Sequence, residues 1–151
     1  MTEHASGVLQ FAQALVWRSR RARAFVFSTE LCEITAELRR SQFPELGEAW
    51  GGGTRIGATL RTFARRYGSA LNPDTVAIVI SDGLDFGEPE ILAAAAAEIR
   101  RTCAALVWIS PDAGAAGYAP ATRGMRAVLP SLSLLAGTRD LPHLARLLRV
   151  R

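Results

Sequence analysis

Two short polar segments of this 151-residue chain carry the side chains best suited to chemistry. The first is Ser81-Asp82-Gly83, which follows an apolar, β-branched run that predicts a strand buried on both faces. A carboxylate directly after such a strand can hold a divalent cation, either directly or through water. It can also accept hydrogen bonds from its own turn, and the tripeptide alone favours that second interpretation.

The second segment contains three consecutive glycines, followed by Thr54 and Arg55 at the predicted start of a helix. The glycines offer free backbone N–H groups, and the Thr54 hydroxyl suits that residue to cap the helix. The segment lacks the Gly-Lys-Ser/Thr ending of a P-loop, which argues against phosphate binding by that route. Trp50 is interpreted as a packing anchor for the glycine loop and Arg55 as a solvated charge.

Strands and helices alternate around these two segments. Apolar runs predict strands at residues 24–27, 31–34, 76–80, 104–109 and 132–135. Apolar spacings of three and four predict helices near residues 8–16, 35–40, 56–67, 89–99, 121–128 and 141–148, with Asp140 capping the last one. This alternation predicts an α/β domain with a mostly parallel sheet. In such sheets ligands bind at the carboxyl ends of strands, which is where both segments lie.

The composition is that of one globular domain. Apolar residues make up 49% of the chain and charged residues 21%, near the average for folded proteins. All 18 basic residues are arginines, a bias that a GC-rich genome produces as easily as a phosphate ligand does. Cys32 and Cys103 lie in apolar stretches without metal-binding spacing, so we expect buried, reduced thiols. No signal peptide or membrane span is evident, and a cytoplasmic protein without membrane insertion is predicted.

Several motifs, taken in chain order, form a more specific pattern. They are Phe25-Val26-Phe27-Ser28-Thr29, residues 50–57, Val79-Ile80-Ser81-Asp82-Gly83, Gly117-Tyr118-Ala119-Pro120, Arg123-Gly124-Met125 and Leu141-Pro142-His143-Leu144. Together they resemble the bacterial CoxE-like branch of the von Willebrand factor A (VWA) domains. The resemblance covers residues 1–151 as a single domain and implies a doubly wound, three-layer VWA/Rossmann-like sandwich.

The resemblance also implies a metal-ion-dependent adhesion site that holds Mg²⁺ or Mn²⁺. Ligands in this family come from three loops: an Asp-x-Ser-x-Ser motif after the first strand, a Thr in the second loop and an Asp in the third. Thr54 and Asp82 match the second and third positions. A neutral hydroxyl and a carboxylate suit a hard cation and leave room for an acidic group from a partner.

The sequence departs from the family pattern at its start. Met1-Thr2-Glu3-His4 stands where the Asp-x-Ser-Gly-Ser motif would end, so the resemblance implies an N-terminally incomplete domain that lacks its first, central strand. Such a loss would leave the edges of two strands unpaired. We therefore expect metal binding to be weak or absent, metal-dependent docking to be impaired, and the reading frame to continue upstream into the missing motif.

By resemblance, the chain is a non-enzymatic protein-interaction module. Such proteins work beside a MoxR-type AAA+ ATPase and a client protein, in maturation of a metalloenzyme such as a molybdenum-containing carbon monoxide dehydrogenase-like enzyme.

Two alternatives remain open. A metal-dependent hydrolase could use Asp82, Asp85, Glu88 and Glu90, although the two glutamates suit the first turn of a helix and no Gly-x-Ser-x-Gly elbow occurs around a nucleophile. His4 and His143 are the chain's two histidines, and we expect them to be solvent-facing or packed. A nucleic-acid-binding domain could use the arginines, but those near helix C-termini already favour the helix dipole, so no nucleic-acid partner is predicted.

Overall fold

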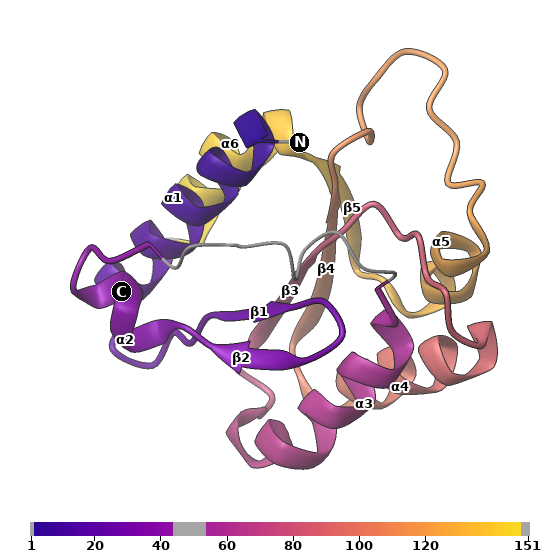
Figure 1. The fold of residues 1–151 in the computed structure, drawn as a ribbon, viewed down its shortest axis with the longest axis horizontal. Coiled ribbons are helices and arrows are strands. Elements are labelled where there is room, and N and C mark those ends of the chain that lie inside the picture. The colour runs from indigo at the N-terminus through magenta and orange to yellow at the C-terminus, as the bar shows by residue number, and fades with distance from the viewer. Residues whose placement is uncertain (1, 44–53, 149–151) are drawn as a thin grey trace.

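A parallel sheet with helices on both faces forms the body of the protein in the computed structural model, which describes residues 2–43 and 54–148. The sheet contains, in this order, β3 (Val76–Ile80), β4 (Ala105–Ser110) and β5 (Leu134–Gly137). One face is covered by α1 (Thr2–Arg18) and α6 (Leu141–Leu147). The other face is covered by α3 (Ile56–Tyr67), α4 (Pro89–Thr102) and α5 (Arg123–Val128) (Figure 1). The predicted three-layer α/β class is confirmed.

The registers of the three strands bring their carboxyl ends to one edge of the sheet. Ile80 at the end of β3 lies opposite Ile109, and Ser110 at the end of β4 lies opposite Gly137. The prediction that β3 is buried on both faces is wrong for most of the strand, because Val76 is 38% exposed and only Val79 is fully buried. The physical reason is that only β4 pairs with β3 among the described strands.

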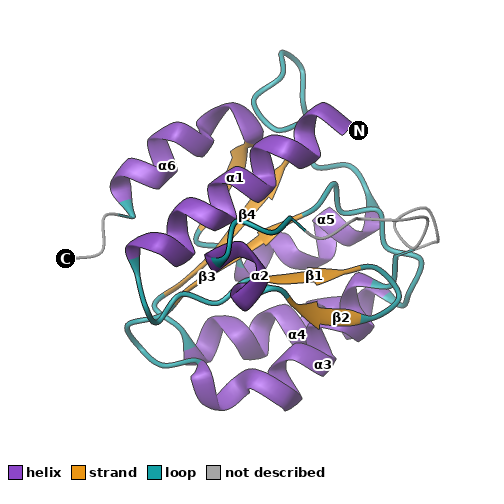
Figure 2. Ribbon diagram, turned by 60° about the vertical axis from the view of Figure 1, so that its left-hand side comes forward, coloured by secondary structure: helices purple, strands orange, loops and turns teal. Residues whose placement is uncertain are grey.

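A separate antiparallel hairpin contains β1 (Phe25–Phe27) and β2 (Leu31–Glu33), followed by α2 (Thr35–Arg39). The ring of Phe25 lies 5.2 Å from that of Phe63 and 4.6 Å from that of Tyr67, both on α3. Figure 2 shows the hairpin next to α2, on the side of α3. In residues 2–43 and 54–148 no strand joins the hairpin to β3. The absence of a central strand from the domain stays a prediction.

Three groups of buried apolar side chains hold these layers together. The largest lies between the sheet and α3, α4 and α5, and it includes Ile56, Leu92, Trp108 and Met125. The second lies under α1 and α6, and the third joins α1 to α2. Each fully buried large side chain contributes about 1.5–3 kcal/mol relative to an exposed one. The predicted inward face of the helix that begins at Pro89 is confirmed.

Several local predictions were wrong or fall outside the described residues. Cys103 is buried as expected, but Cys32 is exposed because alternate side chains of β2 point to opposite faces. Asp140 does not cap α6 with its side chain; its carboxylate instead accepts a hydrogen bond from the Gly137 N–H at 2.9 Å. Trp50 and the glycine run lie outside the described residues. Among the helices that are described, none has the length and apolar character to cross a membrane.

Candidate binding site at the carboxyl edge of the sheet

Asp82 lies in a tight turn directly after β3. Its Oδ1 accepts a hydrogen bond from the Leu84 N–H at 2.9 Å, and the Ser81 hydroxyl oxygen accepts one from the Gly83 N–H at 3.1 Å. Gly83 has a φ of 77°, a left-handed conformation that glycine adopts without strain. The interpretation of Asp82 as an acceptor within its own turn is therefore realised in the structure. None of the hydrogen bonds between described residues uses its second carboxylate oxygen.

Neighbouring elements hold this turn in place. The indole N–H of the buried Trp108 on β4 donates to the Ser81 carbonyl at 2.9 Å. The Thr122 hydroxyl, just before α5, donates to the Gly83 carbonyl at 3.2 Å. Gly124 packs so closely that a Cβ there would overlap the same carbonyl oxygen. Contacts from β4 and α5 thus hold the backbone on both sides of Asp82 in place.

The start of α3 differs from the prediction. Thr54 does not cap this helix with its side chain; Arg55 occupies the cap position and makes no side-chain cap bond. Asp85, from the loop after β3, takes that role: its Oδ1 accepts from the N–H groups of Ile56 at 2.9 Å and Gly87 at 3.0 Å. A carboxylate at a helix N-terminus makes strong hydrogen bonds and interacts favourably with the helix dipole.

The sequence suggested Asp85 only as a possible metal ligand of a hydrolase, whereas in the structure it joins its loop to the start of α3. Its Oδ2 is buried and has no hydrogen-bond partner among the described residues. The sequence carries one signal for its position, the short spacing from Asp82 within a single loop, but nothing in it points to the start of α3. Glu90 lies in the first turn of α4 as predicted, whereas Glu88 occupies the cap position just before that helix and makes no side-chain cap bond.

The loops that carry Thr54 and Asp82 are joined by two hydrogen bonds. One is the Ile56–Asp85 bond, and the other runs from the Phe86 N–H to the Thr54 carbonyl at 3.0 Å. Neither bond joins the side chains of Thr54 and Asp82, so their pairing around a cation stays a prediction. The described residues gather no group of three or more His, Cys, Asp or Glu side chains that could hold a metal. These two oxygen donors therefore do not form a complete metal centre by themselves.

Several arginines have structural partners. Arg18 donates to the Ala145 carbonyl on α6 at 2.8 Å, and Arg39 donates to the Arg20 carbonyl at 3.0 Å. Arg100 donates to the Cys103 carbonyl at the end of α4. These contacts explain part of the arginine content without a nucleic acid.

Arg23 forms an ion pair with Glu33, with a closest N–O distance of 2.7 Å. The hydrogen bond from the guanidinium holds the pKa of the Glu33 carboxyl below its usual range, and burial opposes this effect. The Arg23 guanidinium also lies over the ring of Tyr67 on α3, at 4.9 Å from its centroid. This pair therefore helps to attach the hairpin to α3.

Comparison with known protein families places the chain in a family. Residues 1–144 match the family described as VWA domain containing CoxE-like protein. The matched range includes both loops of the candidate site. No curated protein and no solved structure shows a significant match to the chain.

Proposed function

Because the chain belongs to the CoxE-like family of VWA-domain proteins, we propose that it is a non-enzymatic docking module that works with a MoxR-type AAA+ ATPase. VWA domains of this kind are protein-interaction modules, generally adaptors without catalysis. The proposed task is maturation of a metalloenzyme, such as a molybdenum-containing carbon monoxide dehydrogenase-like enzyme. The family match across both loops is the observation that carries this proposal.

The carboxyl edge of the sheet is the proposed docking face. The Asp82 carboxylate accepts a hydrogen bond within its own turn, β4 and α5 hold the backbone of that turn, and Thr54 lies on the adjoining loop. We propose that Thr54 and Asp82 supply two of the oxygen ligands of Mg²⁺ or Mn²⁺. A bound cation would add positive charge where an acidic side chain of the ATPase or of its client could complete the coordination shell. With two protein donors the affinity for the cation is expected to be weak.

The hydrolase alternative has less support. His143 is exposed on α6, a helix that covers the opposite face of the sheet from α3 and α4. Asp85, the acidic residue nearest in sequence to Asp82, already accepts two backbone hydrogen bonds at the start of α3. The arrangement of described side chains therefore favours docking over hydrolysis.

The test is capture of a purified MoxR-type ATPase by the immobilised chain, in Mg²⁺ and in EDTA. We expect capture in Mg²⁺, with a several-fold loss in EDTA and in Asp82→Ala. Asp74→Ala is the matched control, because Asp74 is an exposed carboxylate just before β3, at the opposite edge of the sheet from Asp82. If the amount of ATPase captured changed neither with Mg²⁺ nor with Asp82→Ala, the docking role of this site would be refuted.

A further inference from the structure

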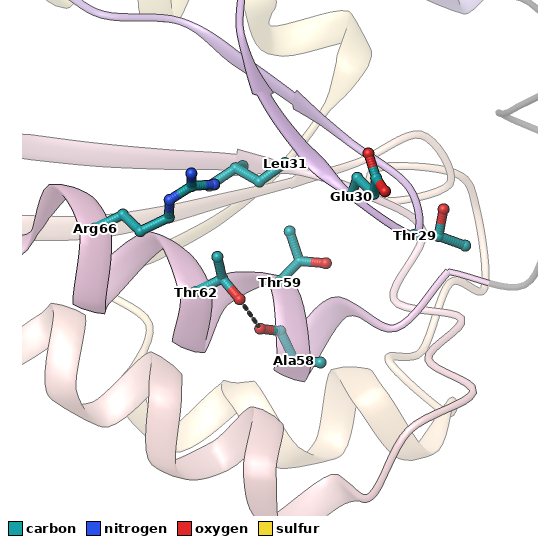
Figure 3. Close-up of a pocket in the computed structure, with 7 residues that line it drawn as sticks. All are labelled: Thr29, Glu30, Leu31, Ala58, Thr59, Thr62 and Arg66. Carbon is teal, nitrogen blue, oxygen red and sulfur yellow. Dashed lines mark hydrogen bonds between the residues drawn. The ribbon is translucent and has the colours of Figure 1, made fainter.

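Two hollows lie on either side of the exposed face of α3 and share one small residue, Ala58. The larger, of about 400 Å³, lies between α3 and the turn of the β1–β2 hairpin. Figure 3 shows Thr59 on the side of α3 that faces this turn, the Thr62 hydroxyl directed at the Ala58 carbonyl, and Arg66 reaching toward Leu31. The smaller, of about 210 Å³, lies between α3 and the residues around Gly87 that lead into α4. We call the two hollows together the α3 groove.

Arginines outnumber acidic residues along the α3 groove. Four exposed arginines follow this side of α3: Arg55, Arg61, Arg65 and Arg66. The helix itself contains no acidic residue, and none of the four forms an ion pair with another described residue. The smaller hollow is lined by Arg55 and Arg61, and the larger by Arg66. Each hollow is also lined by one glutamate, Glu30 in the larger and Glu88 in the smaller, so the lining contains three arginines and two glutamates.

An exposed aromatic residue adjoins these arginines. Phe86 lines the smaller hollow and is 73% exposed, and Leu84 on the same loop is 55% exposed. The backbone of Phe86 is held by its hydrogen bond to Thr54, so the ring projects from a fixed point. Large apolar side chains kept in water beside a hollow are typical of docking sites.

We propose that the α3 groove binds an extended acidic segment of a partner protein, in which an apolar side chain stands close to carboxylates. The carboxylates would pair with Arg61 and Arg66, because a guanidinium binds a carboxylate through two parallel hydrogen bonds. The apolar side chain would pack on Phe86. This inference rests on the proposed function for the existence of a protein partner, and it adds the chemistry that the partner presents.

The charge pattern favours an acidic peptide over a nucleic acid. Because each hollow is lined by one glutamate, Glu30 in the larger and Glu88 in the smaller, a continuous phosphate backbone crossing both hollows would meet both negative charges. A peptide carries negative charge only at its acidic side chains, so its carboxylates can be spaced to meet the arginines alone. The positive charge of the α3 groove comes from arginine side chains, so binding of a carboxylate there requires no metal ion.

The test is a selection from a displayed library of random peptides on the immobilised chain, in EDTA. We expect enriched peptides to carry Asp or Glu within about three positions of Phe, Trp, Leu or Ile. A synthetic copy of an enriched peptide should bind at least tenfold more weakly to two variants of the chain than to wild type. Arg61→Glu reverses one charge, and Ala58→Trp fills the place where the two hollows meet. Arg126→Glu is the matched control, because Arg126 is exposed on α5, and it should leave the affinity unchanged.

Three outcomes would overturn the proposal: no enrichment of acidic and apolar residues together, peptide binding unchanged by Arg61→Glu, or tighter binding of a 20-nucleotide single strand than of the selected peptide. Far-ultraviolet circular dichroism of each variant confirms folding before binding is compared. Failure of the ATPase capture with intact peptide binding would refute the metal-edge function alone. The reverse result would refute the α3 groove alone.

Discussion

Asp85 joins two parts of the candidate site, and its removal has a calculable cost. Its Oδ1 accepts hydrogen bonds from the N–H groups of Ile56 and Gly87, at 2.9 and 3.0 Å. Ile56 is fully buried, so water cannot easily replace the lost acceptor. We therefore expect Asp85→Ala to leave a buried N–H unsatisfied, to remove the cap of α3 and to release the loop after β3.

The size of this effect follows from its components. Loss of a helix cap costs about 0.5–2 kcal/mol, and a buried donor without a partner costs about 1–3 kcal/mol. These costs overlap, and we expect the free energy of unfolding to fall by about 2–3 kcal/mol. For a domain of this length that corresponds to a fall of about 4–12 °C in Tm. Asp85→Asn keeps the accepting oxygen and loses only the charge, so it should cost about 1 kcal/mol or less.

The assay is urea denaturation, followed by circular dichroism and by the fluorescence of the three tryptophans, of which Trp108 is fully buried. Asp112→Ala, which removes an exposed carboxylate, is the control and should lie within about 0.5 kcal/mol of wild type. The reasoning would be refuted if Asp85→Ala were as stable as this control. It would also be refuted if Asp85→Asn were as destabilising as Asp85→Ala, because the hydrogen bonds would then not be the cause.

Three further predictions concern the parts that surround the site. Gly124→Ala would drive a Cβ into the backbone of the loop after β3, so the free energy of unfolding, measured in urea, should fall by about 1–3 kcal/mol. Gly7→Ala is the control: its Cβ meets open space, so it should be neutral or stabilising, and equal effects of the two changes would contradict this packing. Glu33→Gln should cost less than about 1 kcal/mol at pH 7, because its ion pair with Arg23 is partly exposed. The pKa of Glu33 is lowered in the folded protein, so its contribution to stability is fully present above the unfolded pKa of about 4.3 and is lost as pH falls through the folded pKa. A difference in unfolding free energy between variant and wild type that persisted at low pH would count against the ion pair. Phe25→Ala should lower the free energy of unfolding by about 2 kcal/mol, which is less than the cost of losing a fully buried ring. It should also speed amide hydrogen exchange in the β1–β2 hairpin first, and uniform acceleration across the chain would argue against its anchoring role.

Most elements of the fold could be predicted because their signals are local. The continuous apolar run of β4 and the three-and-four spacing of Leu92, Ala95, Ala96 and Ile99 each lie within one short window. The exposure of Val76 could not be predicted in this way, because it depends on which strand lies beside β3. The prediction that Cys32 is buried was wrong for a related reason: in an apolar stretch the sequence does not distinguish the two faces of a three-residue strand.

The site was harder to predict than the fold. Thr54 is a sound local candidate for a helix cap, but Asp85 takes that role from a loop 29 residues beyond Ile56. Sequence spacing cannot rank a distant charged acceptor above a nearby hydroxyl. The α3 groove was missed for the same reason, because Arg61 and Phe86 become neighbours of one hollow only when α3 and the loop after β3 meet.

The central claim is that the carboxyl edge of the sheet docks the ATPase. Amide hydrogen exchange of the chain, measured with and without a MoxR-type ATPase in Mg²⁺, tests it most directly. The account predicts slower exchange in residues 81–87 and at the start of α3, with α1 and α6 unchanged. Protection confined to α1 and α6, with no change in residues 81–87, would contradict it.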